Sequence, residues 1–449
     1  MRVFLRCVAA LALLACSDSA TEPPVSDAGP YPYHRSATGV RTTGTIRILI
    51  LPAQFSDGAP PRVTASEIAV RYFGGANGGA VAESYRLASR GMFTLRGEVA
   101  PWSRAEAPLT TDSAYVLGAI RAADPTIDFG RFDNDGPDGF PNSGDDDGVV
   151  DGGVVVMNSD RDAYCDTGPG RGPHPHTNIR WRTTAGTPFL TNDAKFGGGR
   201  VGVSGYVVMS ALACDGQSTN STGLAHELGH LLFGLPDLYH SVGGTGQAWE
   251  VRRWVVGCWE LMAAGSIWGC GHGPPDYSAG FTSSATFGAW TRTQIGWVTP
   301  TQVLPTRDSV YTLSAMGVGA QVLRIPISAG EYLLMEYREP TAGDRTPPAA
   351  GVLIYHIAES LPLYPSAEAA RQYRVSLIEA DDDSTLLRTE AEGGDRGVSD
   401  DAFGISVNEL RPGTHSGAKG IDGVPFPFVI SEITLDRTGH LARFRIAPR

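Results

Sequence analysis

The stretch Gly223-Leu-Ala-His226-Glu227-Leu-Gly-His230-Leu-Leu-Phe-Gly234-Leu-Pro-Asp237-Leu-Tyr239 decides which fold this chain is expected to adopt. It places His-Glu-x-x-His in an apolar run, and residues four apart share one face of a helix. His226 and His230 are therefore expected to point at one metal ion, with Glu227 beside them to deprotonate a water. The leucines predict a buried helix, which Gly234 and Pro236 end.

The third metal ligand is harder to predict from this stretch than the two histidines. A catalytic zinc site has three protein ligands and one water. Asp237 is predicted to be the third ligand, because it follows the helix-ending Gly234 and the chain can fold back there. Its alternative interpretation is a turn aspartate. His240, Glu250 and Glu260 lie downstream and are also capable of binding zinc.

Met262 is the next feature after the predicted zinc helix, in Gly257-Cys-Trp-Glu-Leu-Met262-Ala-Ala-Gly265. A methionine in such a place is often only a filler of the core. Its distance from the helix suits the Met-turn that underlies the zinc ion in metzincin-like proteases. A Cys258–Cys270 disulfide would fasten this turn.

Residues 1–16 read as an export signal. Arg2 and Arg6 precede a short apolar run that cannot span a bilayer. The run ends at Cys16 in a sequence that resembles the bacterial lipobox, which predicts a lipidated cysteine; the alternative is an ordinary cleaved signal peptide. Residues 17–44 are rich in Ser, Thr, Pro and Gly and are expected to be a flexible linker. We therefore expect a secreted protein or an outer-membrane or cell-surface lipoprotein, touching the membrane only through its anchor.

The cysteines of an exported chain favour disulfides when their number is even. Cys7 belongs to the signal, and Cys16 is the predicted lipid site. The four that remain are Cys165, Cys214, Cys258 and Cys270. Their simplest pairing is 258 with 270 and 165 with 214, although four cysteines allow three connectivities. Without a Cys-x-x-Cys pair, a structural zinc site made of cysteines is not expected.

Length and composition set the class of protein. A chain of 449 residues exceeds one ordinary compact domain. With 56 glycines and 19% charged residues it is expected to be globular and rich in loops. The net charge of -12 argues against a nucleic-acid partner.

The expected secondary structure changes character near residue 305. Before it, strands at 45–51, 92–99, 153–157 and 205–210 and helices at 63–73, 80–90 and 112–123 indicate an α+β domain over 45–305. After it, turn residues separate short apolar runs, as is typical of a β-sandwich-like domain over 306–449. These runs are 310–313, 322–327, 332–337, 352–357, 375–379, 429–433 and 440–446.

The chain resembles the M6 metallopeptidases, which include the immune inhibitor A proteases of bacilli. The matching segments are 80–97 around Ala80-Val-Ala-Glu-Ser-Tyr85, the zinc motif 226–239, Leu261-Met262-Ala263, Ala289-Trp290 with Ile295-Gly-Trp297, Glu331–Glu336 and Gly351–His356. The resemblance implies an exported zinc endopeptidase of zincin (metzincin-like) fold. It also implies His226, His230 and Asp237 as ligands and Glu227 as the base.

One spacing differs from the family's motif, His-Glu-x-x-His-x-x-Gly-x-x-Asp. Three residues, Leu231-Leu-Phe233, separate His230 from Gly234, so that Asp237 comes one position late. A small change in the turn would absorb this insertion.

An acidic loop over 133–151 is the second chemical feature. Calcium prefers clustered oxygen ligands on glycine-containing turns, and the family resemblance implies a calcium site here. The spacing is not that of an EF-hand, and a solvated loop is the alternative. The predicted ligands are Asp133, Asp135, Asp138, Asp147 and Asp151. Asp381–Asp383 and Asp400–Asp401 are interpreted as solvated turns.

The function expected from these features is peptide hydrolysis, with Glu227 as general base and protein or peptides as substrate. We expect a monomer. Tyr239 or His272 is a candidate to stabilise the oxyanion. His174 and His176 are interpreted as part of a proline-rich surface loop. The competing hypotheses are a non-catalytic calcium-binding surface lipoprotein for adhesion or glycan binding, and a zinc amidase acting on a non-protein substrate.

Overall fold

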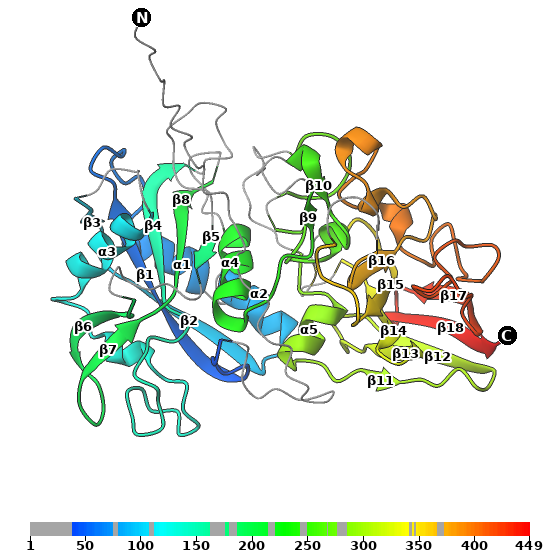
Figure 1. The fold of residues 1–449 in the computed structure, drawn as a ribbon, viewed down its shortest axis with the longest axis horizontal. Coiled ribbons are helices and arrows are strands. Elements are labelled where there is room, and N and C mark those ends of the chain that lie inside the picture. The colour runs from blue at the N-terminus through cyan, green and yellow to red at the C-terminus, as the bar shows by residue number, and fades with distance from the viewer. Residues whose placement is uncertain are drawn as a thin grey trace, which may run out of the picture.

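A computed structural model describes residues 38–74, 80–106, 112–161, 176–178, 186–213, 221–242, 249–266, 268–275, 285–340, 344, 347–365 and 372–449. Over these ranges the protein is a mixed α/β structure with a sheet and helices in its N-terminal half and mainly strands in its C-terminal half (Figure 1). None of the helices in these ranges is long and apolar enough to cross a membrane. The predicted signal segment and Cys16 lie outside the described residues.

The helices are α1 (Ala65–Phe73), α2 (Ala80–Ala88), α3 (Asp112–Ala123), α4 (Ser221–Phe233) and α5 (Ala289–Ile295). Short 3-10 turns are η1 (Phe129–Phe132), η3 (Trp249–Val251), η4 (Gly257–Trp259), η6 (Thr385–Leu387), η7 (Glu390–Glu392) and η8 (Ser399–Asp401). The strands of the first half are β1 (Gly44–Gln54), β2 (Phe93–Val99), β3 (Ser103–Arg104), β4 (Val154–Arg161), β5 (His176–Asn178), β6 (Phe189–Ala194), β7 (Arg200–Val203), β8 (Tyr206–Leu212), β9 (His240–Ser241) and β10 (Arg252–Arg253).

The N-terminal sheet has the order β2-β1-β4-β8-β5, with β3 also paired to β1. Strands β1, β2, β4 and β8 run parallel, and β5 is antiparallel to β8. In β1, Ile46 and Ile48 face one core cluster, which includes residues of α1, α2 and α4. Leu49 and Leu51 face a second cluster, which includes residues of α3. Because helices cover both faces of this sheet, its central strands read as nearly continuous apolar runs.

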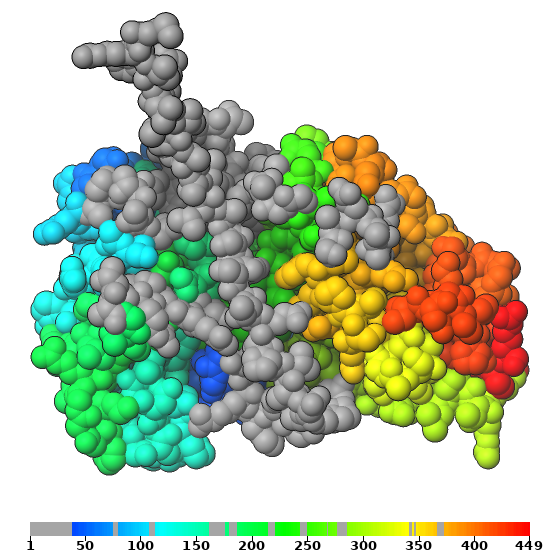
Figure 2. Space-filling view, viewed as in Figure 1, coloured from blue at the N-terminus to red at the C-terminus, as the bar shows by residue number. Residues whose placement is uncertain are grey.

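The C-terminal strands are β11 (Thr301–Gln302), β12 (Ser309–Ser314), β13 (Leu323–Ser328), β14 (Glu331–Arg338), β15 (Gly351–Ala358), β16 (Val375–Ile378), β17 (Phe428–Asp436) and β18 (Leu441–Pro448). They form a sheet of order β11-β13-β14-β15-β16 and a smaller one of order β12-β18-β17. One core cluster draws on both, for example Ile325 and Met335 from the first and Ile430 and Phe444 from the second. In Figure 2 the yellow-to-red C-terminal residues occupy one end of the molecule and the N-terminal ones the other.

The predicted strands and helices of both halves are confirmed in type and place. Their boundaries shift by a few residues; for example, the strand predicted at 45–51 extends over Gly44–Gln54. The predicted domain boundary at 305 stays a prediction. Across it, Tyr332 and Leu353 from the C-terminal strands belong to the same core cluster as Ile48 and Leu228. The two halves are thus joined by a shared apolar core.

Candidate metal centre

Helix α4 positions the candidate metal ligands. Every residue of this helix except His230 is buried, because α4 packs between the N-terminal sheet and residues of the C-terminal half. The Tyr85 hydroxyl of α2 donates a hydrogen bond of 2.8 Å to the Ala225 carbonyl and fixes the helix where the motif begins. The apolar residues around the motif thus hold it in a rigid, buried setting.

His226, His230 and Asp237 converge on one point. The Nε2 atoms of the two histidines lie 3.2 Å apart. They lie 3.1 Å and 3.3 Å from Oδ1 of Asp237. The structure therefore brings together the three residues predicted as zinc ligands.

The protons of this group decide what can bind in it. Nδ1 of His226 lies 2.9 Å from the Leu261 carbonyl, and Nδ1 of His230 lies 2.5 Å from the Leu235 carbonyl. A carbonyl only accepts, so each Nδ1 carries a proton, and the Nε2 atom of each ring is the one that faces Asp237. The buried Asp237 Oδ1 has no hydrogen-bond partner. Three electron-pair donors that face one another in this way fit a cation between them.

The charge of Asp237 depends on the same histidines. Burial by itself raises the pKa of this carboxyl group. Positive charge on His230, followed by the closeness of both imidazole rings to the carboxylate, outweighs burial and holds the pKa well below its usual range. Asp237 is therefore an ionised carboxylate, the form that binds a metal.

The turn after α4 accommodates the three residues that separate His230 from Gly234. Gly234 has a φ of 65°, in the left-handed region that favours glycine. Its N–H donates to the His230 carbonyl at 2.9 Å, and the next N–H, of Leu235, reaches back to the Gly229 carbonyl at 3.3 Å. This wide turn brings Asp237 back over the histidines.

Glu227 is held from the neighbouring strand β5. The Thr177 hydroxyl lies 2.6 Å from Glu227 Oε2, and it also lies 3.1 Å from the Glu227 carbonyl. Glu227 is 6% exposed and does not belong to the group formed by the two histidines and Asp237. Thr177 was not predicted as a site residue, and no motif in the sequence marks it.

Met262 lies directly beneath the helix. A Cβ atom on Gly229 would lie 2.6 Å from the Met262 sulfur, so a larger residue there would displace the Met262 side chain. The Met262 carbonyl accepts from the Leu238 N–H at 2.7 Å. The neighbouring Leu261 carbonyl is the one that orients His226. The segment around Met262 therefore packs against α4 and orients His226.

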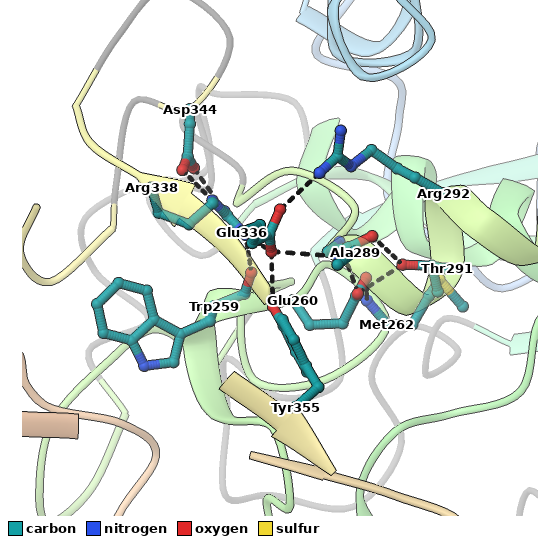
Figure 3. A network of polar contacts seen from close by, with 11 residues as sticks. Trp259, Glu260, Met262, Ala289, Thr291, Arg292, Glu336, Arg338, Asp344 and Tyr355 are labelled. Atoms are coloured by element: carbon teal, nitrogen blue, oxygen red, sulfur yellow. Dashed lines mark hydrogen bonds and ion pairs between the residues drawn. The ribbon is translucent and has the colours of Figure 1, made fainter. Parts of the chain in front are cut away.

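Glu260, considered as a rival ligand, instead shapes this segment (Figure 3). Its carboxylate accepts from the Met262 N–H at 3.1 Å, the Gly288 N–H at 2.7 Å and the Thr291 hydroxyl at 2.6 Å. Glu260 is 1% exposed, and burial raises its pKa despite these donors. Its side chain is thus fully engaged in the fold.

A buried ion-pair network lies next to Glu260 (Figure 3). Arg292 of α5 contacts Glu336 of β14 at 2.5 Å, and Arg338 contacts both Glu336 and Asp344. Arg338 also donates to the Trp259 carbonyl at 2.8 Å. Burial opposes ionisation of Glu336, but the two arginines lower its pKa. The network ties the segment before Met262 to the C-terminal sheet.

The other candidates lie in different settings. His240 Nδ1 contacts the Tyr373 hydroxyl at 3.1 Å, and Glu250 is exposed in η3. Neither joins the described metal-ligating groups. Of the oxyanion candidates, Tyr239 stacks with Arg252, whose guanidinium carbon lies 4.4 Å from the centre of the tyrosine ring. His272 lies 3.7 Å from Asp395.

The structure describes some, but not all, of the other histidines and cysteines considered in the sequence analysis. His176 opens β5 and is half-buried, whereas His174 lies outside the described residues. Cys258 and Cys270 form a disulfide with Cα atoms 5.2 Å apart, as predicted. Cys165 and Cys214 also lie outside the described residues.

The acidic loop forms a second group of oxygen donors. Asp133, Asp135 and Asp146 place carboxylate oxygens within 4.8 Å of one another. Oδ2 of Asp133 is buried without a hydrogen-bond partner. Burial, followed by the charges of Asp146 and Asp147, raises the pKa of Asp133 to about 7. These features fit a cation with oxygen ligands.

The residues that form this group differ in part from the predicted calcium ligands. Asp146 was not among the predicted ligands, since in a run of three aspartates the sequence does not show which side chain turns inward. Asp138 accepts from the Phe140 N–H and Asp147 from the Val149 N–H, so both cap local turns outside the group. Asp151 is buried and accepts from the Asn134 N–H at 2.9 Å.

Comparison of the chain with protein-family profiles and with curated proteins finds no match.

Proposed function

We propose that this protein is an exported zinc endopeptidase with a zincin-type catalytic unit, followed by a β-sandwich-like unit. The observation that carries the proposal is the convergence of two imidazole Nε2 atoms and one carboxylate on a single buried point. Two nitrogens and one oxygen suit zinc, which in catalytic sites leaves a fourth position for water. When bound, zinc would supply Lewis acidity and lower the pKa of that water.

The residues of the chain supply the remaining requirements for hydrolysis. Glu227 follows the first ligand directly and is not itself part of the ligand group, so its carboxylate is available to accept the proton of the attacking water. Thr177 restrains that carboxylate through the 2.6 Å contact. After attack, Glu227 passes the proton to the leaving amine.

The surroundings of the centre favour a preorganised active site. The Leu261 and Leu235 carbonyls fix the orientation of both imidazole rings before any metal arrives. The Met262 segment, closed by the Cys258–Cys270 disulfide, supports them. We also propose calcium at the Asp133, Asp135 and Asp146 group, as a stabilising ion outside the catalytic centre, and lipid anchoring at Cys16.

The proposal is tested by proteolysis with metal exchange. Purified protein is incubated with casein as isolated, after treatment with a zinc chelator, and after zinc is restored. We expect cleavage to stop and to return with zinc. A small non-peptide amide, assayed in parallel, tests the amidase alternative. If the zinc-loaded protein leaves casein intact but hydrolyses the amide, the endopeptidase proposal is wrong; if it cleaves neither, a non-catalytic role is favoured.

A further inference from the structure

A third group of carboxylates lies far along the chain from the metal centre, in the segment that follows β16. Glu379, Asp381 and Asp383 place oxygens within 4.8 Å of one another. Glu379 is 4% exposed, whereas Asp381 and Asp383 reach the surface. The exposure of Asp381 and Asp383 agrees with the solvated turn expected there, whereas Asp401, expected in a second solvated turn, is buried.

Asp401 provides an independent sign of a ligand. Its side chain is 1% exposed, and Oδ1 is buried without a hydrogen-bond partner. The other oxygen accepts from the Val398 N–H at 2.8 Å and from the Trp259 indole at 3.3 Å. A buried carboxylate oxygen with no donor is costly unless a cation binds it.

Asp401 lies beside the group, because the N–H of Ala380, which stands between Glu379 and Asp381, donates to the Asp401 carbonyl at 3.0 Å. Burial and the nearby Asp401 raise the pKa of Glu379 to about 9. Burial, Asp395 and Asp381 raise that of Asp401 to about 7. In the part of the chain that the structure describes, Glu379, Asp381, Asp383 and Asp401 form no ion pair with arginine or lysine. Arg388, for instance, donates to the Asp383 backbone carbonyl instead.

The donor set selects the kind of ion. All of the available side-chain ligands are carboxylate oxygens, without the nitrogen or sulfur that zinc prefers. Calcium binds six to eight oxygens in flexible geometry and accepts water among them. The two exposed aspartates leave a side open to water.

We propose that Glu379, Asp381, Asp383 and Asp401 bind a calcium ion that fastens residues 379–401 against the segment carrying Met262. The contacts between these segments are already in place. Cys258 N–H donates to the Arg396 carbonyl at 2.6 Å, and Gly271 N–H donates to the Gly397 carbonyl at 2.9 Å. The ion would thus brace the support of the metal centre from the far side.

Trp259 makes this site directly observable. Its indole nitrogen lies 3.3 Å from Asp401, so a terbium ion bound in place of calcium would receive energy from the excited tryptophan and emit. Terbium is titrated into calcium-free full-length protein while tryptophan is excited. Calcium is then added as competitor. Trp259→Phe is expected to lose most of the emission while total bound calcium stays unchanged.

A matched pair of variants decides the assignment. Asp383→Asn removes one charge from the proposed site, and its amide oxygen can still accept from the Thr385 N–H. Asp382→Asn removes the same charge one residue away, where the carboxylate contacts Ser416. We expect Asp383→Asn to weaken terbium and calcium binding by at least about tenfold and Asp382→Asn to leave both unchanged.

Two results would overturn the proposed site. The first is that Asp383→Asn binds terbium and calcium as tightly as Asp382→Asn and wild type do. The second is that terbium emission in Trp259→Phe is as strong as in wild type. If Asp401→Asn also folds, it is expected to behave like Asp383→Asn. No readout requires peptidase activity, so the inference stands or fails separately from the proposed function.

Discussion

The positions of two imidazole protons determine what the centre can bind. Each Nδ1–H is committed to a backbone carbonyl, of Leu261 or of Leu235, and each Nε2 is left to face Asp237. Both carbonyls belong to the backbone, which every residue has, so no sequence motif could predict these two contacts. The histidines could be predicted from their spacing, whereas the groups that orient them required the fold.

Replacing Asp237 by alanine tests the third ligand. Removing one of three protein ligands leaves only water to fill the position, so zinc affinity should fall by at least about 100-fold. His240→Ala should bind zinc like wild type, since its ring contacts Tyr373 instead. Zinc content after dialysis is the measurement. Full zinc in Asp237→Ala together with loss in His240→Ala would transfer the ligand role to His240.

Thr177 allows a test of how Glu227 is positioned. Thr177→Val keeps the shape but removes the hydroxyl that contacts Glu227, so kcat should fall by roughly 10- to 100-fold with zinc content unchanged. Thr177→Ser retains the hydroxyl and should stay close to wild type. A kcat for Thr177→Val equal to that of Thr177→Ser would show that this contact does not position the base.

Helix α4 packs directly against the segment around Met262, and the two together position the candidate ligands. Most elements could be predicted from apolar runs, because strands such as β1 are buried on both faces and helices such as α2 carry a clear periodicity. Strand β5 could not be predicted, since three residues give no period. Its Thr177 therefore went unnoticed. The role of Glu260 was also missed, because its partners Gly288 and Thr291 come from a distant part of the chain.

Glu260→Ala tests the support of this unit. The change leaves the donors of Met262, Gly288 and Thr291 without an acceptor in a buried place, which should lower the free energy of unfolding by about 3 kcal/mol or more. Glu250→Ala is the matched control, since that side chain is exposed and should change stability by no more than about 0.5 kcal/mol. Thermal unfolding measures both. Equal melting temperatures would contradict the structural role of Glu260.

A shared apolar core joins the two halves of the protein, and each half carries a group of carboxylates for which we propose a cation. The acidic group of Asp133, Asp135 and Asp146 lies in the N-terminal half, and the group around Glu379 in the C-terminal half. Their positions along the chain were visible in the sequence. Which carboxylates turn inward was not, because runs of consecutive aspartates look alike until the backbone separates their side chains.

Calcium removal should therefore destabilise the protein. An ion that binds only the folded state at 100 times its Kd contributes about 2.7 kcal/mol, so a calcium chelator should lower the melting temperature. Asp133→Asn should show a smaller response than wild type, with the remainder due to the second group. An unchanged melting temperature in wild type with and without calcium would contradict both cation sites.

We propose that Glu227 serves as the base of a zinc peptidase without itself holding the metal. The most direct measurement is casein cleavage by Glu227→Ala, with zinc content determined on the same sample. We expect one zinc per chain, as in wild type, and a rate lower by roughly 100- to 10,000-fold. Near-full cleavage by the zinc-loaded variant would show that Glu227 is not the base.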